Sequence, residues 1–442
     1  MKKVGVIWIG HADYLDRNAS AITGEIQAAL SLIDQIQIDR PAVATSDAEA
    51  VAAARAILRE DLCGAILILT TWVECNVVMS AIKELRGLPL VIWGFPLEEV
   101  QGRRESTGSY VSAAMISGVV KRIELKTRVL IGSWRDPRIL AELQNFSVAA
   151  STADFLFYAK VGLFGYTSMS IYTGTFDHVL LRYRIGPEVE HLDSYSLIAA
   201  AQKVPQTTIE ESIARLKTAA RIQDDVRPEI LQKTMALYAA LRDYASARGW
   251  AAVNVKCQYE FSKEYRVVPC VALSLLAEDR IVASCEGDML NTVSMMILNG
   301  LSGETVTYGD ALTHFGNTVK FSPCGFLPLS MGCGTVKVQK FMEHPGFSGI
   351  QVSGVMRPER VTYLRLVEGV GSYHLLYGTG QGKETLPRGG CMPALDVELD
   401  GPVEKLCEEY AGQHFALAYG DLSAKIEALA AILGIPAVRI QN

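Results

Sequence analysis

The most informative part of the sequence begins with Cys285-Glu286-Gly287-Asp288-Met289-Leu290-Asn291. The apolar run before it predicts a buried strand that ends at Glu286, and residues 289–301 predict a helix that follows. Residues 304–309 predict a second strand, which ends at Asp310. Because hard divalent cations prefer carboxylate oxygen, two acids at the ends of two strands joined by one helix suit a metal site, and the alternative for such acids is capping of the following helix.

Outward from this stretch, the N-terminal third of the chain alternates short apolar strands with helices. Strands are predicted over residues 4–9, 35–45, 65–70 and 89–94. Helices are predicted over residues 20–32, 47–60, 77–85 and 109–122. This alternation indicates a parallel sheet covered on both faces, and right-handed crossovers make a doubly wound, Rossmann-like layer the default.

A second α/β unit is predicted to begin with residues 127–132 and to continue through residues 156–164 and 178–185. The long span 208–248 predicts helices. Two further strands, over residues 252–256 and 280–285, complete the unit, so that Glu286 lies at its end. The unit has the alternation of the first one, and we expect a second Rossmann-like sheet.

From about Thr305 the composition of the sequence changes. Gly and Pro become more frequent, and the predicted strands are short. These strands cover residues 319–321, 335–339, 349–356, 361–366 and 374–377. They favour an antiparallel, barrel-like domain, and a last helix over residues 422–433 ends before Gly434. The predicted fold is therefore two Rossmann-like doubly wound α/β domains, 1–126 and 127–302, followed by a β-rich barrel-like C-terminal domain, 303–442.

Length and composition limit the function. The 442 residues suggest two or three domains, and the 49% of apolar residues can form substantial cores. The net charge of −6 gives no reason to expect nucleic acid or an anionic membrane as a partner. Apolar runs such as residues 64–73 are shorter than the roughly 20 residues that a membrane span needs.

The N-terminus and the cysteines favour a cytoplasmic protein. The chain enters a strand at Val4 without a signal-peptide cleavage pattern. Its nine cysteines are an odd number, are scattered and include no CxxC pair, which is typical of reduced thiols. Cys324 and Cys333 have no histidine partner nearby in the sequence, so we interpret them as ordinary buried cysteines and not as nucleophiles.

The stretch from Glu286 to Asp310 resembles the L-fucose isomerase family, within the wider fucose/arabinose isomerase group. Members carry a Glu-x-Asp, a helix with a Gly at its end and a second Asp at this spacing, here 310 − 286 = 24. A segment similar to Gln413-His414-Phe415-Ala416-Leu417-Ala418-Tyr419-Gly420-Asp421 supplies a histidine in the family. The resemblance implies that Glu286, Asp310 and His414 hold a divalent metal, typically Mn²⁺.

The resemblance implies an aldose–ketose isomerase that acts through an enediol. Such a reaction needs two groups that exchange protons with C1, C2 and their oxygens, and a cation that stabilises the developing charge. By analogy with the family, Glu286 and Asp310 are catalytic as well as metal ligands. The chain is shorter than ordinary L-fucose isomerases, and shortened relatives include enzymes that act on sulfoquinovose. A deoxyhexose or a sulfonated hexose is therefore the expected class of substrate.

Three further residues are candidates for binding the sugar. Trp72 follows a predicted strand, where ligands gather in open α/β sheets, and in the family a tryptophan there reaches a neighbouring subunit's active site. The alternative for Trp72 is a place in the core. Gln258 follows the strand over residues 252–256 and can bind sugar hydroxyls. Arg17 resembles an arginine that family members place against the sugar of an adjacent subunit, and the alternative for it is a solvated surface residue.

Several alternatives stay open from the sequence. Asp288 is interpreted as the N-cap of the following helix in preference to a hydrogen-bond partner of the metal site. Arg357, Arg360 and Arg388 are available to bind an anionic sugar. The resemblance implies a homo-oligomer, a hexamer with shared active sites. Alternative functions are an L-fucose or deoxy-sugar isomerase proper and a non-catalytic, metal-dependent sugar-binding homologue, which the intact acids Glu286 and Asp310 argue against.

Overall fold

The computed structural model describes residues 2–38, 42–100, 103–123, 127–341, 348–386 and 392–441. For residues 17, 18, 100 and 103–105 it describes the backbone alone. The chain forms two compact units, Met1–Phe155 with Ala424–Gly434, and Leu156–Ser423 with Ile435–Asn442. Each unit has its own sheets and is described by itself.

The first unit is built on a parallel sheet in the order β2-β1-β4-β5-β8, with β3 also beside β1. The strands are β1 Val4–Ile9, β2 Ile36–Gln37, β3 Val43–Ala44, β4 Gly64–Leu69, β5 Leu90–Gly94 and β8 Arg128–Ile131. The helices are α1 Arg17–Leu30, α2 Asp47–Arg59, α3 Cys75–Glu84, α4 Ser109–Arg122 and α5 Pro137–Tyr158. Every pairing in this sheet is parallel, as the alternation of strands and helices predicted.

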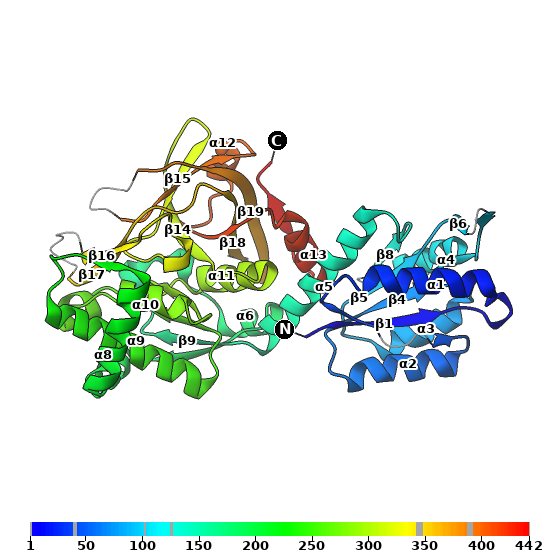
Figure 1. Cartoon of the computed structure of the whole chain (residues 1–442), viewed down its shortest axis with the longest axis horizontal. Helices are drawn as coiled ribbons and strands as arrows, with labels where there is room; N and C mark the ends of the chain where they lie inside the picture. Colours follow the sequence, from blue (N-terminus) through cyan, green and yellow to red (C-terminus); the bar gives the residue numbers. More distant parts are fainter. Residues whose placement is uncertain are drawn as a thin grey trace. The chain divides into compact units, whose positions relative to one another are not determined.

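Helices cover both faces of this sheet (Figure 1). One apolar cluster joins α2, α3 and α4 to strand residues such as Ile7 and Leu67. The other joins α1 and α5 to alternate strand residues such as Trp8 and Ile66. Because successive side chains of a strand point to opposite faces, a strand with both faces covered is apolar throughout, as β4 is.

Two details of the first unit differ from the prediction. The strand expected over residues 35–45 is divided into β2 and β3, and residues 39–41 between them lie outside the described residues. Residues 127–132 do not begin a second sheet, because β8 pairs with β5. The Trp93 indole donates to the carbonyl of Gly132 at 3.0 Å, which ties the two strand ends together. An apolar run predicts a strand but not its partner.

The second unit contains a parallel sheet in the order β10-β9-β12-β13. The strands are β9 Lys160–Phe164, β10 Glu188–Leu192, β12 Ala252–Val255 and β13 Val282–Cys285. The helices of this part include α6 His178–Arg184, α7 Ser194–Ala201, α8 Gln206–Ala219, α9 Pro228–Arg248, α10 Cys270–Ala277 and α11 Met289–Ser302. Strands β12 and β13 are buried along their whole length, and the chain leaves β13 directly at Glu286.

The rest of the second unit is dominated by a closed six-stranded antiparallel barrel. Its order is β18-β21-β14-β15-β20-β19, and β19 pairs with β18 to close it. The strands are β14 Thr307–Phe315, β15 Thr318–Ser322, β18 Arg360–Gly369, β19 Ser372–Lys383, β20 Leu395–Leu399 and β21 His414–Tyr419. The predicted barrel is confirmed, and β22, Ala437–Arg439, extends the sheet beside β19.

Not every predicted strand of this region belongs to the barrel. Strands β16, Lys337–Lys340, and β17, Ile350–Ser353, instead form a small sheet with β11, Arg221–Ile222. Helix α11 contacts β12 and β13 of the parallel sheet and β14, β18 and β21 of the barrel. It therefore lies between the parallel sheet and the barrel of the second unit.

The fold is thus mixed α/β with parallel sheets and an antiparallel barrel, as predicted at that level. The finer division into domains 1–126, 127–302 and 303–442 stays a prediction. Among the helices of the described residues, none combines the length and the apolar character needed to cross a bilayer.

Candidate active site

Asp310 and His414 are paired residues on neighbouring barrel strands. Strands β14 and β21 run antiparallel, and their register places Asp310 opposite His414. Directly opposed residues of a sheet have Cβ atoms about 5 Å apart on the same face. The two side chains therefore project from the same face of the barrel wall. The prediction that Asp310 ends its strand was wrong, because β14 continues past an irregularity after Ala311 to Phe315.

Glu286 reaches the same place from the parallel sheet, as predicted, because it follows the last residue of β13. It has a φ of 68° and is followed by Gly287 with a φ of 70°. A Cβ on Gly287 would lie 2.1 Å from the carbonyl oxygen of Tyr166, so only glycine fits here. The Glu286 carbonyl accepts a hydrogen bond from Ser168 N at 2.9 Å, which anchors the turn from the other side.

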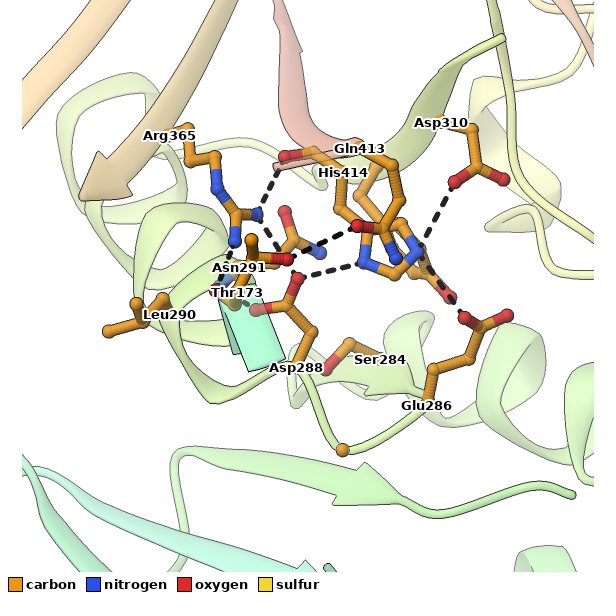
Figure 2. Close-up of polar contacts among 12 residues, drawn as sticks. Thr173, Ser284, Glu286, Asp288, Leu290, Asn291, Asp310, Arg365, Gln413 and His414 are labelled. Atoms are coloured by element: carbon orange, nitrogen blue, oxygen red, sulfur yellow. Dashed lines mark hydrogen bonds and ion pairs between the residues drawn. The ribbon is translucent and has the colours of Figure 1, made fainter. Parts of the chain in front are cut away.

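The structure brings the three predicted metal ligands together (Figure 2). His414 Nε2 lies 3.5 Å from Glu286 Oε2 and 3.5 Å from Asp310 Oδ1. The side chains of His414 and Glu286 are 1% and 8% exposed, whereas that of Asp310 is 26% exposed. The cluster is therefore closed on the Glu286 side and accessible on the Asp310 side, where a substrate can approach.

The charges in this cluster influence one another strongly. Burial alone would raise the pKa of Glu286, but the hydrogen bond and the charge of His414 lower it below its usual value. Burial alone would lower the pKa of His414, but hydrogen bonds to Asp288 and Glu286 raise it well above its usual value. The buried carboxylates of Glu286 and Asp288 thus favour a positive charge at His414, either on its imidazole or on a cation bound to it.

The donor set suits a small divalent cation, and the distances from His414 Nε2 to the two acids are close to those around a bound ion. Two carboxylates and one imidazole are ligands that Mn²⁺ and similar ions accept. Ligand atoms about 2.1 Å from an octahedral ion lie about 3 Å from their neighbours. The separations of 3.5 Å from His414 Nε2 to each carboxylate need to close only slightly to reach that geometry.

A second buried donor set shares Glu286 with the first. Suitable ligand atoms of Cys257, Cys285 and Glu286 lie within 4.8 Å of one another, which makes them a candidate metal-binding triad. Sulfur ligands suit softer ions and bind as thiolates. We favour the carboxylate and imidazole set, because its oxygen and nitrogen ligands suit Mn²⁺ and similar ions.

Asp288 makes both of the contacts that were considered from the sequence. Its Oδ1 accepts from Asn291 N at 2.9 Å, which is the predicted cap of α11. Its Oδ2 lies 2.8 Å from His414 Nδ1, so the weaker alternative is also present. The Glu-x-Asp motif was the sequence signal for the contact of Asp288 with His414. Both acids follow the end of the same strand, so both lie near the same site.

Two residues near the cluster were missed. Arg365 on β18 forms an ion pair with Asp288 at 3.1 Å with both side chains fully buried, and an arginine inside an apolar strand was the available signal. Cys324 Sγ donates to Glu286 Oε1 at 3.5 Å. Burial, followed by the charge of Glu286, raises the pKa of Cys324 well above its usual value. This thiol is therefore a hydrogen-bond donor to Glu286. That role agrees with the interpretation that Cys324 is not a nucleophile.

Gln258 follows β12, the strand beside β13, and is 3% exposed. Its Oε1 is buried and has no hydrogen-bond partner among the described residues. The neighbouring Cys257 contacts Cys285, which precedes Glu286, so Gln258 lies at the same edge of the sheet. A buried amide oxygen without a partner is costly, and a ligand hydroxyl can satisfy it.

Trp72 and Arg17 belong to the first unit. Trp72 follows β4 at the carboxyl edge of its sheet, where its ring lies 5.7 Å from that of His11 and 6.0 Å from that of Tyr14. The tryptophan is therefore part of a small aromatic cluster at the sheet edge and not of the core. Arg17 is the first residue of α1, after its N-cap Asp16, and its side chain lies outside the described residues.

The arginines that were considered for an anionic sugar have other contacts. Arg357 pairs with Glu359 at 2.6 Å and lies over the ring of Tyr419. Arg360 pairs with Asp400. Arg388 lies outside the described residues.

Comparison with known proteins gives relatives along most of the chain. It is 23% identical over 385 residues to a sulfoquinovose isomerase from Alkalicoccus urumqiensis, covering 84% of each chain. A sulfoquinovose isomerase from Clostridium sp. (strain MSTE9) is 22% identical over 386 residues, 85% of this chain and 86% of that one. One from Priestia aryabhattai is 22% identical over 367 residues, 81% of each chain. No protein-family profile matches the sequence.

These relatives confirm the resemblance inferred from the sequence, which included sulfoquinovose isomerases. Their names indicate an isomerase, as predicted.

Proposed function

We propose that this chain is a divalent-metal-dependent aldose–ketose isomerase that converts a hexose to its ketose through an enediol. The observation that carries the proposal is the approach of two buried or half-buried carboxylates to one imidazole nitrogen, each at 3.5 Å. Glu286, Asp310 and His414 would hold the cation, with Mn²⁺ as the proposed ion. When bound, the ion supplies positive charge that polarises the carbonyl and hydroxyl oxygens of the sugar.

The proton transfers fall to the two carboxylates. Moving the carbonyl from C1 to C2 requires one group that removes the proton from C2 and one that carries protons between the two oxygens. Glu286 is ionised, because its lowered pKa keeps it as a carboxylate at neutral pH, and it can accept a proton. Asp310 is more exposed and faces the side where the sugar enters, which suits proton exchange with the sugar and with water.

We propose sulfoquinovose, a hexose with a sulfonate at C6, as the first substrate to test. The support is the name of the relatives that match more than four fifths of the chain. Gln258 would satisfy its unpaired Oε1 with a sugar hydroxyl. Neither Arg357 nor Arg360 is proposed as the anion-binding residue, because each is already paired with an acid.

The proposed assembly is a homo-oligomer, a hexamer with active sites shared between subunits. The support is the aromatic cluster of His11, Tyr14 and Trp72 at the carboxyl edge of the first sheet, where ligands of open α/β sheets bind. Trp72 and Arg17 would complete the sugar pocket of another subunit. The cytoplasmic location expected from the cysteines stays a prediction.

Metal removal and restoration test this function. The protein is treated with a chelator, its metal content is measured, and a panel of aldoses with and without a C6 anion is assayed before and after Mn²⁺ is added. We expect turnover of sulfoquinovose only in the Mn²⁺-loaded protein. Turnover of L-fucose regardless of a C6 charge would assign a deoxy-sugar isomerase instead. Full activity of metal-free protein would reject the metal site, and binding without turnover of any aldose would leave a sugar-binding homologue.

A further inference from the structure

A chain of buried polar contacts lies behind His414, on the side away from Glu286 and Asp310 (Figure 2). Arg365 Nη1 donates to Asp288 Oδ2 at 3.1 Å, and the same oxygen lies 2.8 Å from His414 Nδ1. The side chains of Arg365 and Asp288 are fully buried, and that of His414 is 1% exposed. Buried groups in such a row are held in one arrangement, because each would lose its partner by moving.

Two backbone segments of the second unit, one at Thr173 and one at His414, close around this row. Arg365 Nη1 also donates to the carbonyl oxygen of His414 at 2.9 Å, and its Nη2 donates to that of Thr173 at 2.6 Å. A Cβ on Gly174 would lie 2.8 Å from Asp288 Cα, and one on Gly412 would lie 2.5 Å from Arg365 Cζ. The two glycines therefore allow the chain to pack directly against the ion pair, which leaves no space for the side chains to rotate.

The two oxygens of Asp288 have separate partners. Oδ1 accepts from Asn291 N and so caps α11, whereas Oδ2 serves Arg365 and His414. Arg365 is always charged and lies 3.1 Å from Oδ2 with both side chains fully buried, so Asp288 balances that charge as a carboxylate. An ionised carboxylate only accepts hydrogen bonds, so the proton of this contact belongs to His414 Nδ1.

The tautomer of His414 follows from this contact. With the proton on Nδ1, the neutral imidazole presents the lone pair of Nε2 toward the two carboxylates. A lone pair that faces two negative groups at 3.5 Å is unfavourable by itself and favourable when a cation lies among the three. The ring orientation is therefore the one that a metal ligand needs.

We propose that Asp288 is the positioning residue of His414: its Oδ2, held by Arg365, fixes the Nδ1–H tautomer and aims Nε2 at the cation. The proposal rests on the proposed function, because it assigns a role toward that metal. It goes beyond the capping role that the sequence predicts for Asp288. Arg365 neutralises the buried charge of Asp288 and links its position to the segment around Thr173.

Asp288→Asn separates the two roles of this residue. Asparagine caps helices as well as aspartate does, so Oδ1 can still accept from Asn291 N. Its amide nitrogen then faces His414 Nδ1 and donates to it, which favours the tautomer with the proton on Nε2 and blocks the metal. We expect the affinity for Mn²⁺ to fall about 10- to 100-fold, the effect typical of losing such an outer partner of a ligand. The measurement is titration of metal-free protein with Mn²⁺, with free Mn²⁺ followed by electron paramagnetic resonance.

The matched control is Asp177→Asn. Asp177 caps α6 by accepting from Leu180 N at 2.8 Å, and it has no described contact with a proposed metal ligand. This variant should bind Mn²⁺ like the unmodified protein. Equal Mn²⁺ affinity of Asp288→Asn and the unmodified protein would overturn the positioning role while leaving the proposed function in place. An unmodified protein that binds no Mn²⁺ would instead reject the proposed function.

A second measurement does not depend on a variant that folds. The chain has seven histidines, so ¹⁵N-histidine labelling gives few signals from the ring nitrogens. When Zn²⁺ is added to metal-free protein as a diamagnetic probe, the Nε2 signal of His414 should shift while Nδ1 keeps its proton. A neutral His414 with its only proton on Nε2 would overturn the proposal, even if Asp288→Asn fails to fold because the charge of Arg365 is left unpaired.

Discussion

Glu286 is held in a backbone conformation that residues other than glycine seldom adopt. Its φ of 68° costs roughly 1–3 kcal/mol, and the surrounding contacts must supply that energy. The contacts are present: its N donates to Val255 O at 3.0 Å, and its carbonyl accepts from Ser168 N. Strain of this kind gathers at functional sites, and here it turns the carboxylate from the parallel sheet toward His414 on the barrel.

Glu286→Gln should abolish turnover and weaken metal binding together. Glutamine has nearly the same size, but it carries no charge for the cation and cannot accept the proton from the sugar. The loss of one positioned acid–base group alone predicts a fall in kcat of about 100-fold or more. The measurements are initial rates and Mn²⁺ titration. Glu278→Gln changes a half-buried acid that accepts from Ser330 N outside the site, and it serves as control. Unchanged Mn²⁺ affinity in Glu286→Gln would show that this carboxylate is no ligand.

The turn that joins β13 to α11 determines where Glu286 points. Gly287 within it approaches the carbonyl of Tyr166, whereas Gly303, which ends α11 with a φ of 73°, has open space around it. The two glycines have similar positive φ angles and differ in their surroundings. They therefore separate the cost of backbone strain from the cost of a clash.

Gly303→Ala should lower the free energy of unfolding by about 1–2 kcal/mol through the left-handed backbone alone. Gly287→Ala should lower it by about 1–3 kcal/mol more, because its Cβ would lie 2.1 Å from Tyr166 O and the turn must shift. It should also reduce Mn²⁺ affinity, since Glu286 moves with the turn. Urea unfolding of both variants measures the difference. Equal losses would mean that the turn relaxes freely.

The pair His178 and His191 predicts an acid sensitivity of the second unit. Their rings lie 4.7 Å apart, and burial, followed by the charge of His178, lowers the pKa of His191 from its ordinary value of 6.5. The neutral form is therefore favoured in the folded state. The unfolded chain binds more protons as the pH falls below about 6.5, so the stability that His191 contributes is present above that pH and is lost below it.

His191→Gln removes this titration while keeping a polar side chain. We expect the unfolding free energy to fall between pH 7.5 and pH 5.5 in the unmodified protein and to fall less in the variant. Urea unfolding at the two pH values gives the comparison, and NMR titration of His191 gives its pKa directly. A pKa above 6.5 for His191 would contradict the cause assigned here.

The sequence predicted the helices and strands better than it predicted which strands pair and which side chains are in contact. The strand before Glu286 and the helix after it followed from an apolar run and a capping Asp288. Asp310 was placed at a strand end because the exposed second half of β14 has no apolar run to mark it. The pairing of β8 with β5 and the contact of Arg365 with Asp288 join residues far apart in the chain, and periodicity carries no information on such pairs.

At the scale of the whole molecule, the candidate residues are divided between two compact units. Glu286, Asp310, His414 and Gln258 belong to the second unit, and Trp72 and Arg17 belong to the first. The proposed shared site assigns the second group to a neighbouring subunit. A lone subunit would then hold a complete metal site and an incomplete sugar pocket.

Mixing two impaired variants tests the shared site. Trp72→Ala should raise KM because the sugar loses an aromatic contact, whereas Glu286→Gln loses turnover. Hybrid oligomers contain some sites in which neither changed residue is present, so mixing and reassembly should restore part of the activity. The mass in solution should be that of an oligomer. A fully active monomer, or no recovery in hybrids that mass spectrometry shows to have formed, would contradict the shared site.

The most direct test of the central claim is deuterium exchange during turnover of sulfoquinovose in ²H₂O, followed by NMR. An enediol formed by Glu286 and Asp310 exchanges the transferred proton with solvent, so deuterium should appear at C1 of the ketose and at C2 of the recovered aldose. Incorporation should require Mn²⁺ and should be absent in Glu286→Gln. Conversion without any incorporation of deuterium, or at an unchanged rate in metal-stripped protein, would contradict the account.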